Sequence, residues 1–217
     1  MLRKFLLLIF PPKCILCKKI LTGDETDFCR HCRENAPEYK KSSLRFSFVA
    51  GWTAVWYYKD VVRSSIHRFK FRHYRNYASA YGRALAMRLE NDAALDFDIL
   101  TYVPVAALRK CERGYDQVEL ICNVVGENLG ITPIRTLRKI RNTPPQSGFK
   151  DVARRRANVL GAYSCPCPEL IKGKRILLLD DVVTTGATAS ECARVLTTAG
   201  AKEVRCAFLA VTEYKRK

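Results

Sequence analysis

Residues 176–188 read ILLLDDVVTTGAT. Four aliphatic residues run directly into two adjacent carboxylates, Asp180 and Asp181, and then into a segment rich in hydroxyl groups and glycine. A short, continuous apolar run is typical of a strand that is buried on both faces in a parallel sheet. In open α/β sheets, ligands bind beyond the carboxyl ends of the strands. We therefore expect a buried strand over residues 176–179, followed by a ligand site that contains both carboxylates.

The segment after the carboxylates carries groups that hold an anion. Thr184, Thr185 and Thr188 supply hydroxyls. Gly186 permits a tight turn before the next helix, whose first N–H groups attract negative charge. The spacing of Thr188 and Glu191 predicts a capping box at the start of that helix. These features favour a ribose phosphate, with the carboxylates accepting hydrogen bonds from the ribose hydroxyls. The alternative is an ordinary strand-to-helix turn with ordinary caps.

The rest of the chain alternates between strand-like and helix-like patterns. We expect strands at residues 98–105, 131–134, 176–179 and 204–211, a strand or hairpin at 46–58, and helices at 61–75, 77–90, 114–129 and 188–199. Alternation at this spacing predicts an α/β fold with a parallel, doubly wound sheet.

Basic residues dominate the charged surface. The formal net charge of +17 favours polyanionic partners, although lysines and arginines that simply solvate the surface are the alternative. Within 61–75, basic and aromatic residues alternate, which suits contact with a nucleic-acid backbone and its bases. The nucleic-acid candidates are Arg68, Lys70, Arg72 and Arg75. An amphipathic helix with a solvated rim explains the same pattern.

Residues 141–164 show no periodic pattern, which is unusual for so long a stretch in a compact domain unless it is a functional lid. Its basic residues suit a mobile lid over a phosphorylated ligand. The lid candidates are Lys150, Arg154, Arg155 and Arg156. A basic arm on single-stranded DNA and a disordered charged loop are the alternatives.

Four of the ten cysteines form two CxxC pairs, Cys14 with Cys17 and Cys29 with Cys32. Two such turns bring four thiolates around one ion, and four thiolates leave no open coordination position. We therefore expect a structural zinc ion in an N-terminal module, rather than a redox pair or a chance arrangement.

The N-terminus has a short apolar run over residues 5–10. This run is far shorter than the roughly 20 residues of a membrane-spanning helix, and no small-residue cleavage site follows it. We expect an amphipathic or strand-like segment packed on the body of a cytoplasmic protein.

The stretch at 176–188 resembles the 5-phosphoribosyl-1-pyrophosphate (PRPP) signature of type I phosphoribosyltransferases. Along nearly its whole length, the chain also resembles the ComF family of competence-associated, phosphoribosyltransferase-like proteins. Besides the CxxC pairs and the signature, that resemblance rests on IHRFKF at 66–71, VPV at 103–105, RGYDQ at 113–117, TPPQ at 143–146 and RRAN at 155–158. Two departures are Ala106, where many members have proline, and Asp116, where many have asparagine. They leave the signature intact and bear on local loop geometry.

The resemblance implies a zinc-binding module over residues 1–45 and a type I phosphoribosyltransferase domain over 46–217. It implies that Mg²⁺ accompanies PRPP and that Asp180 and Asp181 are catalytic. The implied PRPP-binding residues are Asp180, Asp181, Val182, Val183, Thr184, Thr185, Gly186, Ala187 and Thr188. The implied pyrophosphate-loop residues are Val105, Arg109, Lys110 and Arg113.

Two functions are compatible with these expectations. One is an accessory protein that binds PRPP and takes part in the uptake or handling of transforming single-stranded DNA, with a competence helicase as a partner. The other is an active phosphoribosyltransferase of nucleotide metabolism or salvage whose acceptor is unknown. The fold alone does not choose between them, because one fold hosts many functions.

Overall fold

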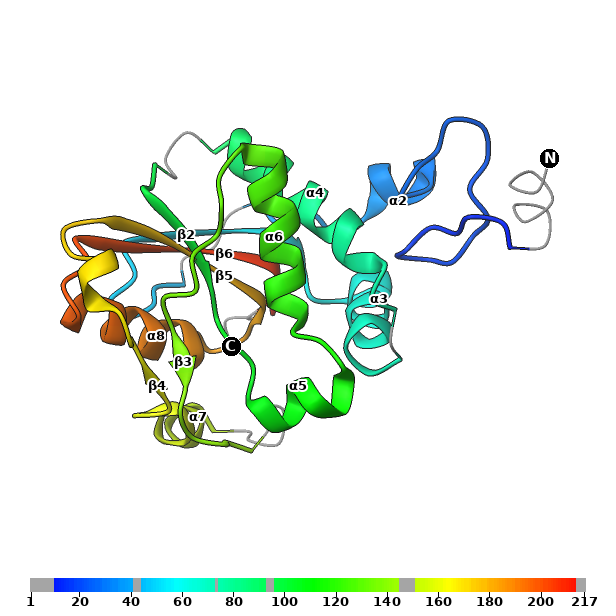
Figure 1. The fold of residues 1–217 in the computed structure, drawn as a ribbon. Coiled ribbons are helices and arrows are strands. Elements are labelled where there is room, and N and C mark those ends of the chain that lie inside the picture. Colours follow the sequence, from blue (N-terminus) through cyan, green and yellow to red (C-terminus); the bar gives the residue numbers. More distant parts are fainter. Residues whose placement is uncertain (1–9, 41–43, 73, 93–95, 145–150, 214–217) are drawn as a thin grey trace.

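The computed structural model describes residues 10–40, 44–72, 74–92, 96–144 and 151–213 (Figure 1). In chain order its elements are α2 (Arg30–Asn35), β1 (Gly51–Tyr57), α3 (Asp60–Phe71), α4 (Tyr77–Glu90), β2 (Ile99–Tyr102), α5 (Ala107–Arg113), α6 (Gln117–Leu129), β3 (Arg138–Lys139), α7 (Val152–Val159), β4 (Tyr163–Ser164), a 3₁₀ turn (Pro168–Leu170), β5 (Arg175–Val183), α8 (Ala187–Thr198) and β6 (Glu203–Val211). The segment expected at the extreme N-terminus, residues 1–9, lies outside the described residues.

The central sheet has the strand order β1-β6-β5-β2, and all three pairings are parallel, as the sequence predicts. Strand β5 therefore lies inside the sheet, between β6 and β2. Its pairing with β2 ends at Tyr102 opposite Leu179, whereas its pairing with β6 continues to Val183 opposite Val211. The sheet consequently opens on the β2 side of β5 just after Leu179.

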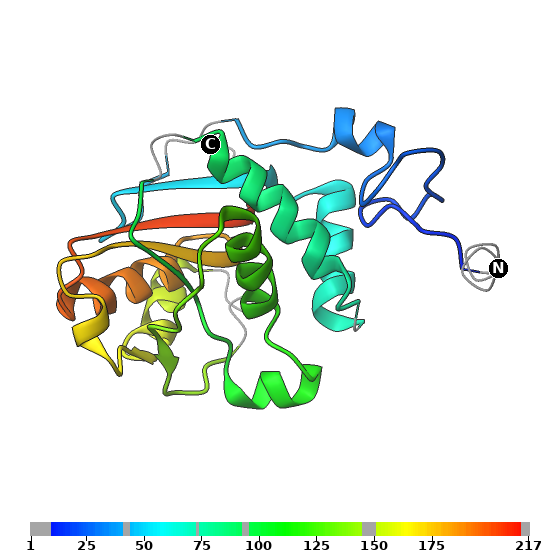
Figure 2. The same cartoon turned by 45° about the horizontal axis from the view of Figure 1, so that its top comes forward.

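Each face of the sheet is covered by helices (Figures 1 and 2). Leu177 and Leu179 of β5 pack into the core that contains residues of α3, α4 and α6. Ile176 and Leu178 pack into the opposite core, which contains residues of α8. Successive side chains of a strand point to opposite faces. The unbroken aliphatic run before Asp180 therefore supplies both cores at once.

Several helices begin and end close to where the sequence predicts. Helix α4 coincides with the expected range, and α6 ends at Gly130, whose φ of 68° lies in the left-handed region that favours glycine. Helices α4 and α6 approach closely at Gly82, where an added Cβ would lie 2.4 Å from the Val124 Cβ. Glycine at that position permits these two helices to cover one face of the sheet together.

Two expected features of the middle region are wrong. Residues 131–134 form no strand, although the Ile134 N–H donates to the Leu100 carbonyl at 2.9 Å. Pro133 has no N–H group and cannot donate a hydrogen bond to a ladder. The stretch 141–164 is not structureless, because it contains α7 and β4, and β4 pairs antiparallel with β3. Asp151 caps α7 by accepting a hydrogen bond from the Ala153 N–H at 3.0 Å.

The N-terminal segment around α2 lies beside α3 and α4, at the end of the molecule away from α8 (Figures 1 and 2). Cys14, Ile15 and Leu16 are buried in the same core as α3, α4 and α6. None of the helices in the described part of the chain has the length and apolar character that a membrane span requires.

Candidate ligand cleft and metal centre

A cleft of about 800 Å³ opens at the carboxyl ends of β2 and β5. The Val103 N–H donates to the Leu179 carbonyl at 2.9 Å, and beyond this bond the chain after β2 turns away into α5. The structure thereby places every residue from 180 to 188 at the wall of the cleft. The lining residues from this segment are Asp180, Asp181, Val182, Val183, Thr184, Thr185, Gly186, Ala187 and Thr188. We expected β5 to stop before the carboxylates, but it continues through both of them to Val183.

Asp181 is buried and lies on the same face of β5 as α3 and α6. Its Oδ2 atom is 2.8 Å from the Lys70 ammonium and accepts a hydrogen bond from the Gln117 amide at 3.2 Å. Its Oδ1 atom accepts from the Val182 N–H at 2.6 Å. Burial alone raises the pKa of Asp181, but the charge of Lys70 and these hydrogen bonds outweigh it and lower the pKa below its ordinary value. Asp181 is therefore an ionised carboxylate.

Asp180 follows the alternation of the strand and lies on the opposite face, in a different electrostatic setting. Its Oδ1 accepts a hydrogen bond from the Asp181 N–H at 2.8 Å. Burial and the negative charge of Asp181 raise the pKa of Asp180 to about 8. Asp181 is thus ionised, whereas Asp180 keeps its proton until the pH is near neutral. Once it has lost the proton, Asp180 attracts positive charge.

The loop after the carboxylates approaches the rest of the chain closely. Gly186 has a φ of 73°, and an added Cβ there would lie 2.0 Å from the Phe46 ring. Gly186 is also the residue that precedes α8, and no side chain caps this helix. The expected capping box is therefore wrong. Glu191 instead accepts a hydrogen bond from the Gly161 N–H and pairs with Arg194 at 2.8 Å.

Two buried polar atoms in the cleft wall have no hydrogen-bond partner among the residues that the structure describes. They are the Thr185 hydroxyl and the Gln117 side-chain oxygen. An unsatisfied buried polar group costs free energy, so such atoms mark where a ligand or water supplies the missing bond. The hydroxyl suits a phosphate oxygen, and the amide oxygen suits a ligand hydroxyl.

The expected pyrophosphate loop is largely helix α5, and its residues have different environments. Arg109 lines the cleft and donates to the Thr143 carbonyl at 3.0 Å. Arg113 also lines it, and its guanidinium stands 5.0 Å from the Phe71 ring centre. Val105 lies at the cleft wall, where its N–H donates to Asp116. Lys110 is not among the described lining residues, and its ammonium is 2.8 Å from Glu119.

The lid candidates separate in the same way. Arg155 lines the cleft and donates to the Thr184 hydroxyl at 2.8 Å, which links α7 to the signature. Arg154 lines a second, smaller pocket of about 350 Å³, and Arg156 is exposed. Lys150 lies outside the described residues.

Two of the nucleic-acid candidates make internal contacts. Lys70 pairs with Asp181 in the cleft, and Arg68 donates to the Ile15 and Leu16 carbonyls. Arg72 and Arg75 are exposed. The pattern of basic and aromatic residues does not show which of these side chains turns inward.

The polar residues of the cleft wall that the sequence did not assign to the ligand site include Lys70, which was expected to contact nucleic acid, and also Gln117 and Lys139. Burial lowers the pKa of Lys139, which stacks its ammonium 5.2 Å from the Tyr163 ring centre. Gln117 belongs to the RGYDQ motif, so a signal for it was present in the sequence. The sequence offers no comparable signal for Lys139.

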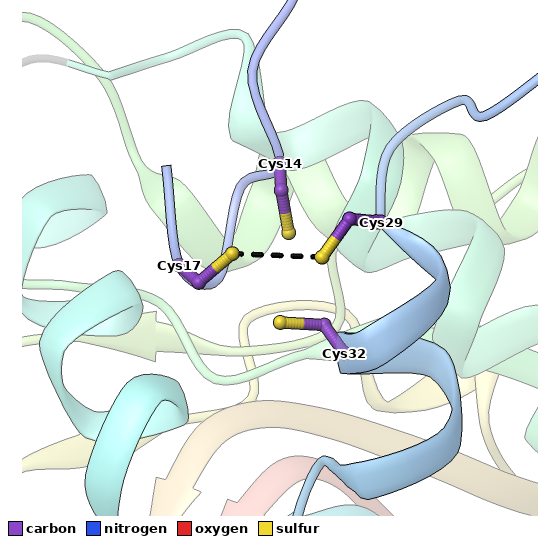
Figure 3. Close-up of side chains that lie close together, drawn as sticks. All are labelled: Cys14, Cys17, Cys29 and Cys32. Carbon is purple, nitrogen blue, oxygen red and sulfur yellow. Dashed lines mark hydrogen bonds between the residues drawn. The ribbon is translucent and has the colours of Figure 1, made fainter. Parts of the chain in front are cut away.

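The four CxxC cysteines converge at one point (Figure 3). Their Sγ atoms all lie within 4.8 Å of one another, and those of Cys17 and Cys29 are 3.6 Å apart. Four sulfurs at tetrahedral corners, each about 2.3 Å from a zinc ion, would be separated by about 3.8 Å. The arrangement therefore fits a closed structural zinc centre. His31, next to two of the ligands, is exposed and contacts Asn35.

Comparison with known proteins agrees with both parts of this description. Residues 128–217 match the phosphoribosyl transferase domain family, and residues 5–43 match the double zinc ribbon domain family. The chain is therefore an α/β protein with a type I phosphoribosyltransferase fold and an N-terminal zinc ribbon.

Three sequence relatives indicate a more specific group among proteins with this fold. The chain is 26% identical over 230 residues to competence protein ComFC of Streptococcus pneumoniae, covering 89% of the chain and 97% of that protein. It is 25% identical over 186 residues to competence protein F of Haemophilus influenzae, covering 82% and 75%. It is 30% identical over 145 residues to the DNA utilization protein YhgH of Salmonella typhimurium, covering 64% of the chain but only 63% of that protein. These relatives, together with the phosphoribosyl transferase domain, indicate a ComF-type protein.

The metal centre makes a first prediction. The purified protein is expected to contain one zinc ion per chain, and Cys29→Ser is expected to lose most of it, because three thiolates no longer close the tetrahedron. Zinc is measured by atomic emission against protein concentration. Cys111→Ser is the matched control, since Cys111 is exposed and outside the cluster. A wild-type protein with no zinc and a disulfide among these cysteines would contradict the assignment.

The different pKa values of the two carboxylates predict how the free energy of unfolding depends on pH. The raised pKa of Asp180 means that the unfolded chain loses this proton near pH 4 and the folded protein near pH 8. The free energy of unfolding therefore falls through this window as the pH rises. Asp180→Asn removes that loss, so its stability relative to the wild type should increase from about pH 4 to about pH 8. Urea unfolding across this range measures the difference.

Asp181→Asn serves as the comparison of opposite sign. The pKa of Asp181 is lowered, so its stabilising contribution is present above its unfolded pKa and is lost only in acid. Substituting it should reduce stability at neutral pH and leave Lys70 without its partner. If the Asp180→Asn and wild-type curves run parallel from pH 4 to 8, the charge assignment is wrong.

Proposed function

We propose that the chain binds PRPP, together with Mg²⁺, in the cleft at the carboxyl ends of β2 and β5. The observation that carries the proposal is the meeting of two carboxylates, a hydroxyl-rich turn and several cationic side chains around one cavity of about 800 Å³. A ribose needs hydrogen-bond acceptors, whereas a phosphate and a pyrophosphate need donors and positive charge. The wall of the cleft contains all of these groups.

Each part of the ligand has matching residues. Asp180 and Asp181 face the ribose hydroxyls, and the turn at 184–188 before α8 offers hydroxyls and N–H groups to the 5-phosphate. Arg109 and Arg113 face the pyrophosphate from α5. Mg²⁺ prefers ligand oxygens and water to a full protein cage, so it would neutralise pyrophosphate charge beside the carboxylates.

Helix α7 supplies the side of the cleft that covers the ligand. Arg155 already contacts the Thr184 hydroxyl, in the segment assigned to the 5-phosphate. A guanidinium there binds phosphate through paired N–H donors. The bound phosphate therefore competes with Thr184 for Arg155 and holds α7 against the signature.

We further propose that the protein acts in DNA utilisation, in the handling of single-stranded DNA during natural competence. This step draws on the relatives named competence protein F, ComFC and DNA utilization protein YhgH. The strongly basic composition favours a polyanionic partner. Of the four nucleic-acid candidates, Arg72 and Arg75 are exposed, and they are the residues we assign to the DNA backbone.

PRPP binding is tested by calorimetry in the presence of Mg²⁺. The double variant Asp180→Asn/Asp181→Asn is expected to abolish binding, because neutral amides do not provide the acceptor charge that the ribose hydroxyls and the metal require. Asp24→Asn/Asp92→Asn, two aspartates outside the cleft, is the matched control. Zinc content and circular dichroism establish that each variant is folded. Unchanged affinity in the signature variant would exclude the ribose assignment.

DNA binding is tested through its salt dependence. Affinity for a single-stranded oligonucleotide should fall linearly on a logarithmic plot against salt, with a slope of about −0.7 for each phosphate contacted. Arg72→Gln/Arg75→Gln should reduce that slope by about 1.4, because two contacts are lost. Arg63→Gln, an exposed arginine earlier on α3, is the control. A flat salt response, or no binding at low salt, would contradict a DNA surface.

A further inference from the structure

Helix α3 contacts both the zinc ribbon and the ligand cleft. At one position, the Ser65 hydroxyl donates to the Ile15 carbonyl at 2.5 Å. One turn later, the Arg68 guanidinium donates to the carbonyls of Ile15 and Leu16 at 2.8 and 2.7 Å. Ile15 and Leu16 are the two residues between Cys14 and Cys17. Helix α3 is thus hydrogen-bonded to the backbone of the first CxxC turn.

These hydrogen bonds come from one fully buried side chain, Ser65, and one partly buried side chain, Arg68. Ser65 is fully buried and also hydrogen-bonds the Tyr81 hydroxyl at 2.6 Å. Hydrogen bonds from a charged donor are stronger than neutral ones. Without Arg68, the Leu16 carbonyl would lose its side-chain donor and the Ile15 carbonyl would keep only Ser65. The position of the first CxxC turn and the position of α3 therefore constrain each other.

The same helix ends in the cleft. Lys70, two residues after Arg68, places its ammonium 2.8 Å from Asp181. The preceding residue, Phe69, is fully buried, and its carbonyl accepts a hydrogen bond from the Tyr115 hydroxyl at 2.5 Å. Val62 and Ile66 are also fully buried along the same face of α3. A packed helix of this kind moves as one body, because its core side chains fill the space around them.

We infer that α3 couples the zinc centre to the ligand cleft, with Arg68 as the positioning residue on the metal side and Lys70 on the ligand side. Bound zinc determines the position of the first CxxC turn, and the turn determines the position of α3 through the hydrogen bonds of Ser65 and Arg68. The position of α3 in turn determines where Lys70, the counter-ion of Asp181, lies. Occupancy of the zinc centre then strengthens binding in the cleft, and a ligand in the cleft strengthens the binding of zinc. Such coupling is reciprocal by thermodynamic necessity. The inference rests on the proposed function only for the identity of PRPP as the ligand.

The first experiment needs no ligand. The rate of zinc transfer to a chromophoric chelator is measured for the wild type, Lys70→Met, Arg68→Gln and the double variant, with Arg63→Gln as the control on the exposed side of α3. We expect both single variants to release zinc several-fold faster and the double variant to add little, since both substitutions break one mechanical link. A Lys70→Met rate equal to that of the wild type would overturn the coupling.

The second experiment adds PRPP with Mg²⁺. We expect the ligand to slow zinc transfer from the wild type and from Arg63→Gln but not from Arg68→Gln. Arg68→Gln should also bind PRPP about fivefold or more weakly, the lower range of typical coupling between sites. Equal PRPP affinity in the wild type and in Arg68→Gln would overturn the inference. If the wild type shows no PRPP binding, the proposed function fails, and the ligand-free zinc rates still decide the coupling.

A folding defect is separated from a coupling defect by Arg68→Lys. This variant keeps a positive donor that can reach one of the two carbonyls, so it should lie between the wild type and Arg68→Gln in both zinc release and PRPP affinity. Circular dichroism and thermal unfolding identify a variant that has not folded. Identical behaviour of Arg68→Lys and Arg68→Gln at equal stability would mean that the carbonyl contacts do not transmit the effect, and would overturn the role of Arg68.

Discussion

Two carboxylates follow each other in sequence at the point where β2 separates from β5, and burying both would be costly without compensation. The protein compensates them unequally. Asp181 receives an ammonium and an amide, while Asp180 receives a backbone N–H and holds its proton to a higher pH. The position of α3, which supplies Lys70, and that of α6, which supplies Gln117, both serve this compensation. The architecture around β5 is therefore tied to one ion pair.

Much of this arrangement could be predicted because it depends on local pattern. The aliphatic run before Asp180, the spacing of the four cysteines and the periodicity of residues 77–90 each specify a structure with little reference to the rest of the chain. Parallel order follows from the alternation of strands and helices. The cleft at the strand ends follows from the same topology.

The features that could not be predicted depend on contacts between distant segments. Lys70 lies in the last turn of α3 and Arg72 directly follows the helix, and only the packing of Phe69 decides that Lys70 faces the cleft while Arg72 faces solvent. Glu191 has the spacing of a capping residue, yet its carboxylate accepts a hydrogen bond from the Gly161 N–H and forms an ion pair with Arg194. In each case tertiary contacts override a valid local preference.

Phe46 gives the molecule an unexpected property. It stands at the start of the region expected to be the phosphoribosyltransferase domain, where its ring fills the space next to Gly186 and packs against Trp52 and Phe208. A residue that precedes β1 thus packs directly against the signature loop. The phosphoribosyltransferase-like part is consequently not a freely transplantable unit: a graft that begins at β1 would leave a hole beneath the loop that gives the site its shape.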